Sequence, residues 1–328
     1  MKGKREMKKL LAIICAVMLL VTLTACGAPA ADDGKYVIGI CQLTPHPALD
    51  KATQGFKDAV IKGIGAENIT FDFQDAAGEP STCSTIINGF VASDVDLIMA
   101  NATPAVAAAF NATDSIPILG TSVTEYGVAL GLKDFSGTVG ENVSGTSDLA
   151  DLTKQAQMIV DWCPDAKKVA LLYCSAEPNS KYQVDVVKAE LEKKGIECKI
   201  SAFTDTSDLF SVTTEACNFA DAIYVPTDNT VANNATAIDS ICRPAGVPII
   251  AGEAGICAGC GIATMSIDYY DLGYLTGEMA VQILKDGADI TKMPIAYVEE
   301  VSYLYNEDIC TALGITPLPG YDKLVPAE

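Results

Sequence analysis

The chain has 328 residues and a formal net charge of −20 at neutral pH, because 42 Asp and Glu outnumber 22 Lys and Arg. This acidity argues against nucleic acid and anionic membrane surfaces as partners, since both attract positive charge. The length suits one large domain or two of medium size. Most cysteines after residue 26 are expected to be buried free thiols, because a chain this long can build a core without disulfides.

The N-terminus has the pattern of a secretion signal. Basic residues at positions 2–9 precede an apolar run, Leu10–Leu23, that is too short for a typical membrane span. The run ends in "LTAC", which resembles the lipobox of bacterial lipoproteins, although a plain secretory signal is the alternative. We therefore predict a signal peptide over residues 1–25, a lipid anchor on Cys26 and a tether over 26–34. The mature protein is expected on the extracytoplasmic face of the cell membrane.

Strand-like and helical patterns alternate in the next segment, which is expected to form a first lobe. The expected strands are "YVIGIC" (36–41), "ITFDFQ" (69–74), "VDLIMA" (95–100) and "IPILG" (116–120). The helical patterns between them cover 47–62, 81–92 and 104–112. Continuous apolar strands that alternate with helices predict a parallel sheet covered on both faces.

A second series of the same design begins near Ser147. It predicts helices over 147–161, 178–194, 208–218 and 229–243, and strands over 168–174, 197–203, 221–226 and 247–252. "GENVSGTSD" (140–148) is expected to be a hinge, the amphipathic 270–285 to return to the first lobe, and "IAYVEEVSYLY" to form one long strand. The fold class is α/β with two doubly wound parallel-sheet lobes: 35–142 with about 270–292, and 143–269 with about 293–328.

In open α/β sheets, ligands bind at the carboxyl ends of parallel strands, so the strand-to-helix loops are the candidate site. These loops are rich in Ser, Thr, Asn and carboxylates and contain almost no Lys or Arg. They are 42–47, 101–105, 121–125, 174–180, 226–230, 252–255 and 268–271. Helices that begin at such loops also offer free N–H groups to an anion.

Several catalytic chemistries lack their residues. His46 is the only histidine, so a triad or a zinc site of the usual kind is not expected. His46 lies between two prolines, where ligand contact, loop packing and, less readily, catalysis are the alternatives. There is no phosphate-binding P-loop and no dinucleotide fingerprint, and no cofactor is expected. "CAGC" (257–260) is either a reversible disulfide or a tight turn.

A hydrolase that uses a pair of carboxylates remains an alternative. Glu125, Glu177, Asp228 and Glu253 all follow strands and are expected to face the same cleft. No feature of the sequence marks one of them as an acid rather than as a counter-charge.

Seven segments together resemble the substrate-binding lipoproteins of ABC transporters of the tryptophan/tyrosine type. They are "QLTPHPALDKATQGFKDAV", "IMANATPAVAAAFNAT", "IPILGTSVTE", "NVSGTSD", "YCSAEPNS", "VPTDNTVANN" and "IDYYDLGYLTGEMAVQIL". The resemblance covers essentially the whole chain after the signal. It implies a type I periplasmic-binding fold whose two lobes close over a small ligand, often an aromatic amino acid.

In the first lobe, the resemblance implies that Thr103 and the N–H groups that open the helix at Pro104–Ala105 hold a ligand carboxylate. Ser122 and Val123 would line the same lobe. Helix capping is the alternative role of Thr103.

In the second lobe, the resemblance implies that Ser175, Asn179 and Ser180 face the ligand. Asp228 would pair with the α-amino group, with Glu253 as the second candidate. Helix capping is again the alternative for Asn179 and Asp228.

Four further residues complete the expected site. Thr44 and His46 would contact the side-chain end of the ligand. Asn142 and Asp268 lie near the crossovers between the lobes, where a hinge role and a pocket role are both open.

We therefore expect a non-enzymatic solute-binding lipoprotein that binds an amino acid, such as Trp, Tyr or Phe, and docks on an ABC permease. The alternatives are the carboxylate-dependent hydrolase and a sensor or adhesin module on the same fold.

Overall fold

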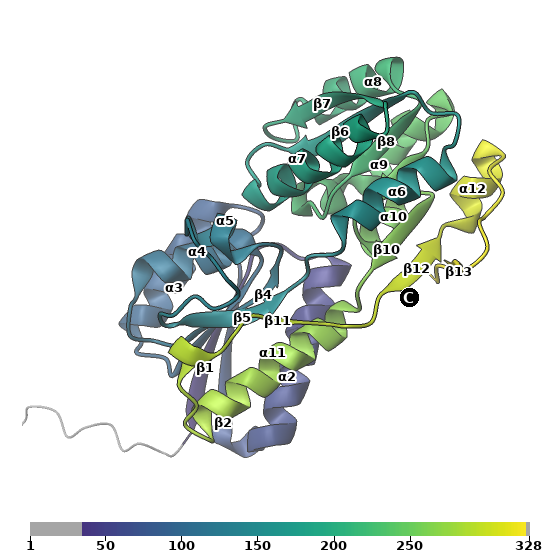
Figure 1. Ribbon diagram of the computed structural model, residues 1–328. Coiled ribbons are helices and arrows are strands. Elements are labelled where there is room, and N and C mark those ends of the chain that lie inside the picture. The colour runs from purple at the N-terminus through teal and green to yellow at the C-terminus, as the bar shows by residue number, and fades with distance from the viewer. Residues whose placement is uncertain (1–34, 326–328) are drawn as a thin grey trace, which may run out of the picture. The chain divides into compact units, whose positions relative to one another are not determined.

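The computed structural model describes residues 35–325, which form two α/β lobes (Figure 1). The predicted signal peptide, the Cys26 lipid site and the tether lie outside the described residues. Among the residues that are described, none of the helices is both long and apolar enough to cross a bilayer.

The first lobe is built on a six-stranded sheet in the order β11-β5-β4-β3-β1-β2, in which all pairings are parallel. Its strands are β1 (Tyr36–Gln42), β2 (Ile69–Asp75), β3 (Leu97–Asn101), β4 (Ile118–Val123), β5 (Val143–Ser147) and β11 (Ala296–Tyr297). Its helical segments are α2 (Pro47–Ile64), η1 (Ala66–Asn68), α3 (Pro80–Ala92), α4 (Thr103–Ala112), α5 (Tyr126–Leu130), α11 (Tyr269–Leu284) and η2 (Ile290–Lys292).

The second lobe is built on a seven-stranded sheet in the order β13-β12-β10-β9-β8-β6-β7, parallel except for the β10–β12 pair. Its strands are β6 (Lys168–Cys174), β7 (Glu197–Phe203), β8 (Ala222–Val225), β9 (Ile249–Ala251), β10 (Ala263–Ser266), β12 (Ser302–Tyr305) and β13 (Asp322–Lys323). Its helices are α6 (Leu152–Trp162), α7 (Pro178–Lys193), α8 (Leu209–Phe219), α9 (Asn229–Ala245), α10 (Ala254–Gly259) and α12 (Glu307–Leu313).

Each sheet has helices on both faces because its central strands are apolar on both sides. In β1, Ile40 packs into the core with α2 and α11, whereas the next residue, Cys41, packs into the core with α3 and α4. Both side chains are fully buried. Consecutive residues of a strand point to opposite faces, so a continuous apolar run requires two covering layers. The predicted fold class is therefore confirmed.

The boundaries between the lobes differ from the expected ones. The strand β5, placed in the second lobe by the sequence, pairs with β4 in the first sheet, and α6 begins only at Leu152. The expected long strand over 295–305 is two short strands in different sheets, because β11 pairs with β5 and β12 pairs with β10. The chain thus passes between the lobes three times, at 148–151, 267–268 and 298–301 (Figure 1).

The ten cysteines of residues 35–325 are all free thiols, as expected, and seven of them are buried. Cys257 is buried on α10 and Cys260 is the buried residue that ends it, and their sulfurs contact the backbone carbonyls of Gly261 and Ile256. The CAGC motif is therefore the last turn of a helix in this structure, with both cysteines as free thiols.

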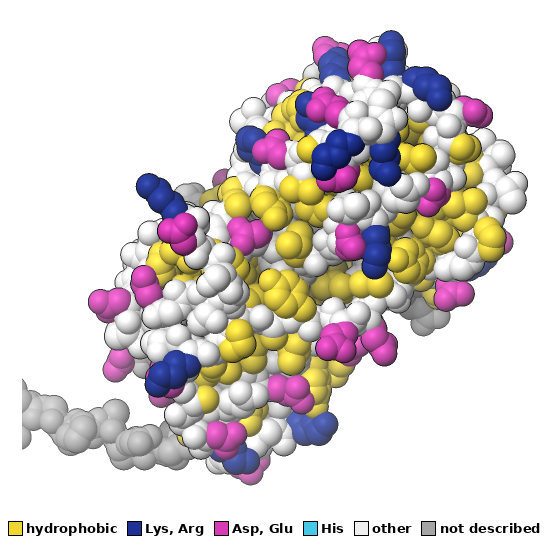
Figure 2. Space-filling view, in the orientation of Figure 1, with side chains coloured by type: hydrophobic (Ala, Val, Ile, Leu, Met, Phe, Trp, Pro, Cys, Tyr) yellow, Lys and Arg dark blue, Asp and Glu magenta, His cyan; other side chains and the backbone are white. Residues whose placement is uncertain are grey.

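The surface of the face in Figure 2 carries Lys and Arg side chains scattered among Asp and Glu. Several are paired along helices, as in Lys181–Asp185 and Lys188–Glu192. This face therefore offers no extended basic patch to a polyanion.

The helix α11 returns to the first lobe and packs against α2 so closely that two of its positions require glycine. A Cβ atom on Gly273 would lie 1.9 Å from the Ala52 carbonyl oxygen, and one on Gly277 would lie 2.5 Å from the Phe56 carbonyl oxygen. Backbone atoms cannot move aside as a flexible side chain can, so the contact excludes any larger residue.

We predict that Gly273→Ala lowers the free energy of unfolding by about 2–3 kcal/mol, because the methyl group forces α2 and α11 apart. Urea denaturation followed by circular dichroism measures the change. The control is Gly89→Ala on the exposed side of α3, where a Cβ atom meets nothing within 4 Å. That variant should gain roughly 0.5–1 kcal/mol from the lower entropy of its unfolded chain. Equal stability of the two variants would contradict the packing argument.

Candidate functional site

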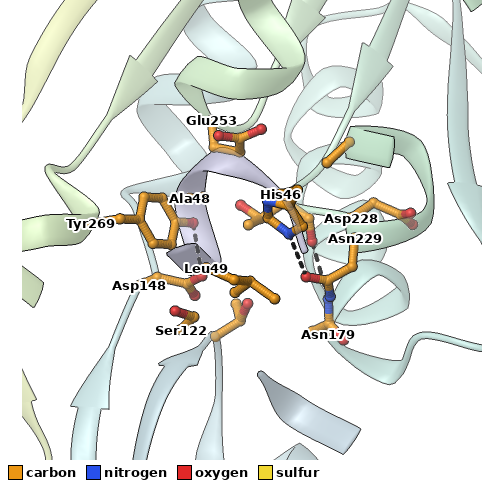
Figure 3. A pocket seen from close by; sticks show the side chains of 13 residues that line it. His46, Ala48, Leu49, Ser122, Asp148, Asn179, Asp228, Asn229, Glu253 and Tyr269 are labelled. Atoms are coloured by element: carbon orange, nitrogen blue, oxygen red, sulfur yellow. Dashed lines mark hydrogen bonds between the residues drawn. The ribbon is translucent and has the colours of Figure 1, made fainter. Parts of the chain in front are cut away.

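A small pocket lies where the two lobes meet, and it is formed by the loops at the carboxyl ends of strands in both sheets (Figure 3). Polar side chains dominate its wall, and no Lys or Arg is among the described residues that line it. The lining residues are His46, Ala48, Leu49, Ser122, Thr124, Asp148, Asn179, Thr227, Asp228, Asn229, Ala232, Glu253 and Tyr269.

Asp148 is one of three buried carboxylates among the described residues of this pocket and follows β5 at the first crossing between the lobes. Its Oδ2 accepts a hydrogen bond of 2.9 Å from the hydroxyl of Tyr269, the first residue of α11, directly after the second crossing. Its Oδ1 is buried and has no hydrogen-bond partner among the described residues. Burial raises the pKa of Asp148, and the nearby charge of Glu253 adds to this, whereas the hydroxyls of Tyr269 and Thr124 oppose it. The pocket thus holds a desolvated carboxylate that lacks a cation.

Two more buried polar atoms in the pocket wall have no partner within the described chain. They are Ser122 Oγ and Asn179 Oδ1, from the first and second lobes respectively. The Ser122 backbone has a φ of 53°, a left-handed conformation that is unfavourable for a residue with a side chain. It lies where the register between β4 and β5 shifts. Unpaired buried polar groups are costly, so three of them around one pocket indicate a polar ligand.

The first turn of α2 supplies positive potential to the same pocket. His46 is the N-cap residue but makes no side-chain capping bond, and Pro47 occupies the first turn. Ala48 and Leu49 follow and line the pocket. N–H groups in the first turn of a helix have no intrahelical acceptor, and the helix dipole places partial positive charge there. The start of this 18-residue helix is therefore suited to a ligand carboxylate.

The other two carboxylates of the pocket, Asp228 and Glu253, are engaged in helix capping. Asp228 accepts hydrogen bonds from the backbone N–H groups of Val231 and Cys174, both 2.8 Å long. Glu253 accepts from the N–H groups that open α10. Burial, followed by the charge of Glu177, raises the pKa of Asp228 well above its usual range. Figure 3 shows the Asp228 carboxylate turned away from Asp148 and Ser122, towards its own lobe.

Glu177 organises the second-lobe wall from the start of α7. Its carboxylate accepts hydrogen bonds from the backbone and side chain of both Asn229 and Thr230. A buried carboxylate with four donors holds the first turn of α9 in place. Asn179 donates to the Thr227 carbonyl, which ties α7 to the same loop.

A protein-family model described as ABC transporter substrate binding protein matches residues 37–318. The chain belongs to this family. Across 325 residues it is 36% identical to a tyrosine-binding protein of Clostridioides difficile strain R20291, an alignment that covers 95% of this chain and 94% of that protein.

Solved structures also support the family assignment of this substrate-binding protein. An ABC domain from Streptococcus pneumonia in complex with L-Trp is 32% identical and has a TM-score of 0.81, covering 87% of this chain and 99% of that one. The ligand-free, open structure of a substrate-binding protein with adhesive properties from Clostridium difficile is 38% identical. Its TM-score is 0.68, with 88% of this chain and 98% of that one covered. The fold is that of type I periplasmic binding proteins.

Five of the residues expected in the site of this substrate-binding protein do line the pocket: His46, Ser122, Asn179, Asp228 and Glu253. Asp228 and Glu253, the expected partners of an ammonium group, use both carboxylate oxygens on N–H groups, so they function first as caps.

The expected carboxylate-binding residues of the first lobe lie elsewhere. Thr103 and Pro104 line a separate groove, and Pro104 also borders the cavity on the other side of His46. The Ala105 N–H donates to the Ala102 carbonyl within the first turn of α4. Val123 is a fully buried core residue.

The remaining expected residues also lie outside the pocket. Asn142 binds the carbonyls of Thr113 and Ile116 at the opposite end of β4. Ser175 is exposed and donates to the Phe203 carbonyl, whereas Ser180 is fully buried and contacts Thr227. Asp268 caps α11 and borders a neighbouring cavity. Thr44 does not line the pocket, and its Oγ1 accepts a hydrogen bond from Asn233 of the second lobe.

The sequence reasoning missed Asp148, Tyr269, Leu49 and Asn229. Asp148 and Tyr269 were both within quoted segments, "NVSGTSD" and "IDYYDLG", but were not chosen. The available signal was their position in or directly beside the crossings between the lobes. In the described residues, no cluster of three or more His, Cys, Asp or Glu side chains is arranged to hold a metal ion.

We predict that Asp148→Asn stabilises the ligand-free protein at neutral pH. The folded-state pKa of Asp148 is raised, so the ionised form opposes folding above that pKa, and the cost disappears as the pH falls below the unfolded-state pKa. Urea denaturation at several pH values should give the variant a larger free energy of unfolding than the wild type at pH 7, and an equal one near pH 3. The control is Asp134→Asn, an exposed carboxylate. A destabilised Asp148→Asn at pH 7 would contradict the assignment.

Proposed function

We propose that this substrate-binding protein is a lipid-anchored, extracytoplasmic receptor that delivers an aromatic α-amino acid to an ABC importer. The observation that carries the amino acid assignment is the buried Asp148 Oδ1, which lacks a partner in the same pocket as the uncapped start of α2. Together they provide a negative group and a positive helix end, the complement of a zwitterion.

In this proposal the ligand ammonium pairs with Asp148, and its carboxylate binds the first-turn N–H groups of α2 and the Ser122 hydroxyl. This assigns the ammonium to Asp148 instead of Asp228 or Glu253, since both oxygens of each of those carboxylates already accept N–H groups. The ligand contacts both lobes through Asp148 and Asn179, as ligand-driven closure requires.

An aromatic side chain is supported by two relatives, one a tyrosine-binding protein and the other solved with L-Trp. Tyr269 and Leu49 lie beside Asp148 and would offer flat and aliphatic surfaces to a ring (Figure 3). The enclosed space has room for about one water molecule, so the lobes must part to admit an aromatic side chain. Aromatic rings favour such contacts by about 0.5–1.5 kcal/mol beyond their burial.

Membrane anchoring through Cys26 and a permease partner follow from the lipobox pattern and from family membership. Metabolic labelling with a radioactive fatty acid tests the anchor, because Cys26→Ser should abolish the label and release the protein from the membrane fraction. Retention of label in that variant would overturn the lipid site.

Adhesion is a second candidate function, because one relative is a substrate-binding protein with adhesive properties. Deletion of the gene should abolish uptake of the labelled amino acid if the protein serves transport. Normal uptake together with lost adhesion would favour the adhesin. Chemical alteration of the bound amino acid would instead favour the hydrolase.

We predict that Asp148→Asn weakens the binding of L-Tyr, L-Trp or L-Phe at least about 30-fold, because it removes a buried charge pair. Isothermal titration calorimetry measures the affinity, and thermal shift checks it, since a bound ligand raises the melting temperature by mass action. Asp134→Asn should bind normally. Wild-type affinity in Asp148→Asn would rule out the Asp148–ammonium pair.

Ligand analogues separate the two ends of the proposed zwitterion site. Tyramine lacks the carboxylate and 3-(4-hydroxyphenyl)propionate lacks the ammonium, so we expect both to bind the wild type far more weakly than L-Tyr. Asp148→Asn should reduce the affinity for the propionate less than the affinity for L-Tyr, because the propionate has no ammonium group to pair with Asp148. Strong binding of the propionate to the wild type would contradict the role of Asp148.

We also predict that affinity for the amino acid falls as the pH decreases through the raised pKa of ligand-free Asp148, since the protonated carboxyl cannot pair with an ammonium. Titration calorimetry from pH 7.5 to 4.5 measures this. Asp228 also has a raised pKa, so its titration can contribute to the change in affinity. The diagnostic quantity is therefore the slope of log affinity against pH for the wild type minus the same slope for Asp148→Asn. Identical slopes would exclude Asp148 as the titrating group.

A further inference from the structure

Two hydrogen bonds join the lobes beside the pocket, both between the β1–α2 segment and α9. The Asn233 Nδ2 group donates to Thr44 Oγ1 at 2.8 Å. His46 Nε2 lies 3.1 Å from Asn229 Oδ1. Thr44 and His46 belong to the first lobe, and Asn229 and Asn233 to the second.

The spacing of these four residues matches across the contact. Thr44 and His46 are two residues apart in a segment that is extended at His46, with φ −162° and ψ 160°. Two extended residues span about 6.6 Å. Asn229 and Asn233 are four residues apart on α9, which is one turn and a rise of about 6 Å. The two contacts are thus made with residues one turn apart on α9, so the segment from Thr44 to His46 lies beside the first turns of that helix.

The His46 pair is held in a fixed orientation from the second lobe. Asn229 donates its Nδ2 group to Glu177 at 2.8 Å, which leaves Oδ1 as the atom that faces His46. His46 Nε2 is therefore the donor in this bond, because an amide oxygen can only accept.

The Thr44–Asn233 pair lies outside the pocket. Neither residue is part of the pocket wall, and both border a neighbouring cavity between the lobes instead. The pocket thus has Asp148 and Tyr269, at the crossings, on one side and the His46–Asn229 pair on the other (Figure 3).

We infer that Thr44, His46, Asn229 and Asn233 form a polar clasp that holds the two lobes closed and thereby sets the affinity for the ligand. This deepens the proposed function and rests on it for the identity of the ligand. Contacts that exist only in the closed state raise its population, and the apparent affinity rises in proportion. Thr44 and Asn233 are positioning residues, since they act on the ligand through closure and not by contact.

The comparison structures agree with a closed arrangement of the lobes. The sequence identity of the chain is 38% to the open, ligand-free relative and 32% to the protein in the L-Trp complex. Its TM-score is nevertheless 0.68 for the open structure and 0.81 for the complex.

The test uses Asn233→Ala, Thr44→Val and the double variant, with Asn234→Ala as the matched control. Asn234 borders the same cavity, but its Nδ2 group donates to the Thr230 carbonyl of its own helix. We expect each single variant to bind the best amino acid about 2–10-fold more weakly, the range of one hydrogen bond. The double variant should match the single ones, because the same bond is lost, and Asn234→Ala should bind as the wild type does.

A merely structural role is excluded by two further measurements. The unfolding free energy of the ligand-free single variants should stay close to that of Asn234→Ala, and ligand dissociation should be faster in stopped-flow experiments. Independent losses that multiply in the double variant, or wild-type affinity in all variants, would overturn the clasp.

Small-angle X-ray scattering of the proteins without ligand provides a readout that does not depend on the ligand. We expect a larger radius of gyration for Asn233→Ala than for Asn234→Ala, because fewer molecules are closed. If no amino acid binds the wild type, the proposed ligand is wrong, and the clasp is then tested by scattering alone. Equal radii for the two variants would then contradict it.

Discussion

The Asp148 carboxylate lies where the chain first leaves one sheet for the other, buried and without a lysine or arginine among the described residues of its pocket. The hydroxyl groups of Tyr269 and Thr124 and a backbone N–H compensate in part for its lost hydration. A buried charge that is not paired is unfavourable, so the Asp148 carboxylate is a group that a cation would stabilise. The family to which the chain belongs captures small solutes, and a ligand cation is the simplest group to do so. Because Asp148 begins the first crossing and Tyr269 directly follows the second, the same interaction acts on the hinge.

The other acidic residues around the pocket have a different role. Glu177, Asp228 and Glu253 accept N–H groups from the starts of α9 and α10, which holds the second-lobe wall in place. The first N–H groups of a helix need acceptors, and these carboxylates provide them. Their oxygens therefore already accept hydrogen bonds before a ligand binds. The wall is therefore preorganised, and the polar atoms without partners on the described chain, on Ser122, Asp148 and Asn179, mark where the ligand is still needed.

Closure in this account depends on two kinds of contact on opposite sides of the pocket. The ligand draws the lobes together at Asp148, and the bonds from Thr44 and His46 to α9 support the closed form at the other side. Each bond is weak in water, so the closed form they support can reopen. The close packing of α2 on α11 through Gly273 and Gly277 makes the first lobe a firm base for both sets of contacts.

The amino-acid sequence by itself determined the two-lobed α/β fold, because apolar runs such as Tyr36–Cys41 alternate with amphipathic helices regardless of distant contacts. It also located His46, Ser122 and Asn179 near the pocket, since loops after parallel strands share one edge of a sheet. It could not single out Asp148, because the pattern places that residue at the end of the expected hinge, 140–148, and not in one of the strand-to-helix loops. Only the tertiary structure decided that Asp228 has its oxygens filled by the N–H groups of Cys174 and Val231, whereas Asp148 Oδ1 stays without a partner in the described chain. Those donors come from segments that only the folded chain brings together, and no local pattern encodes their distance.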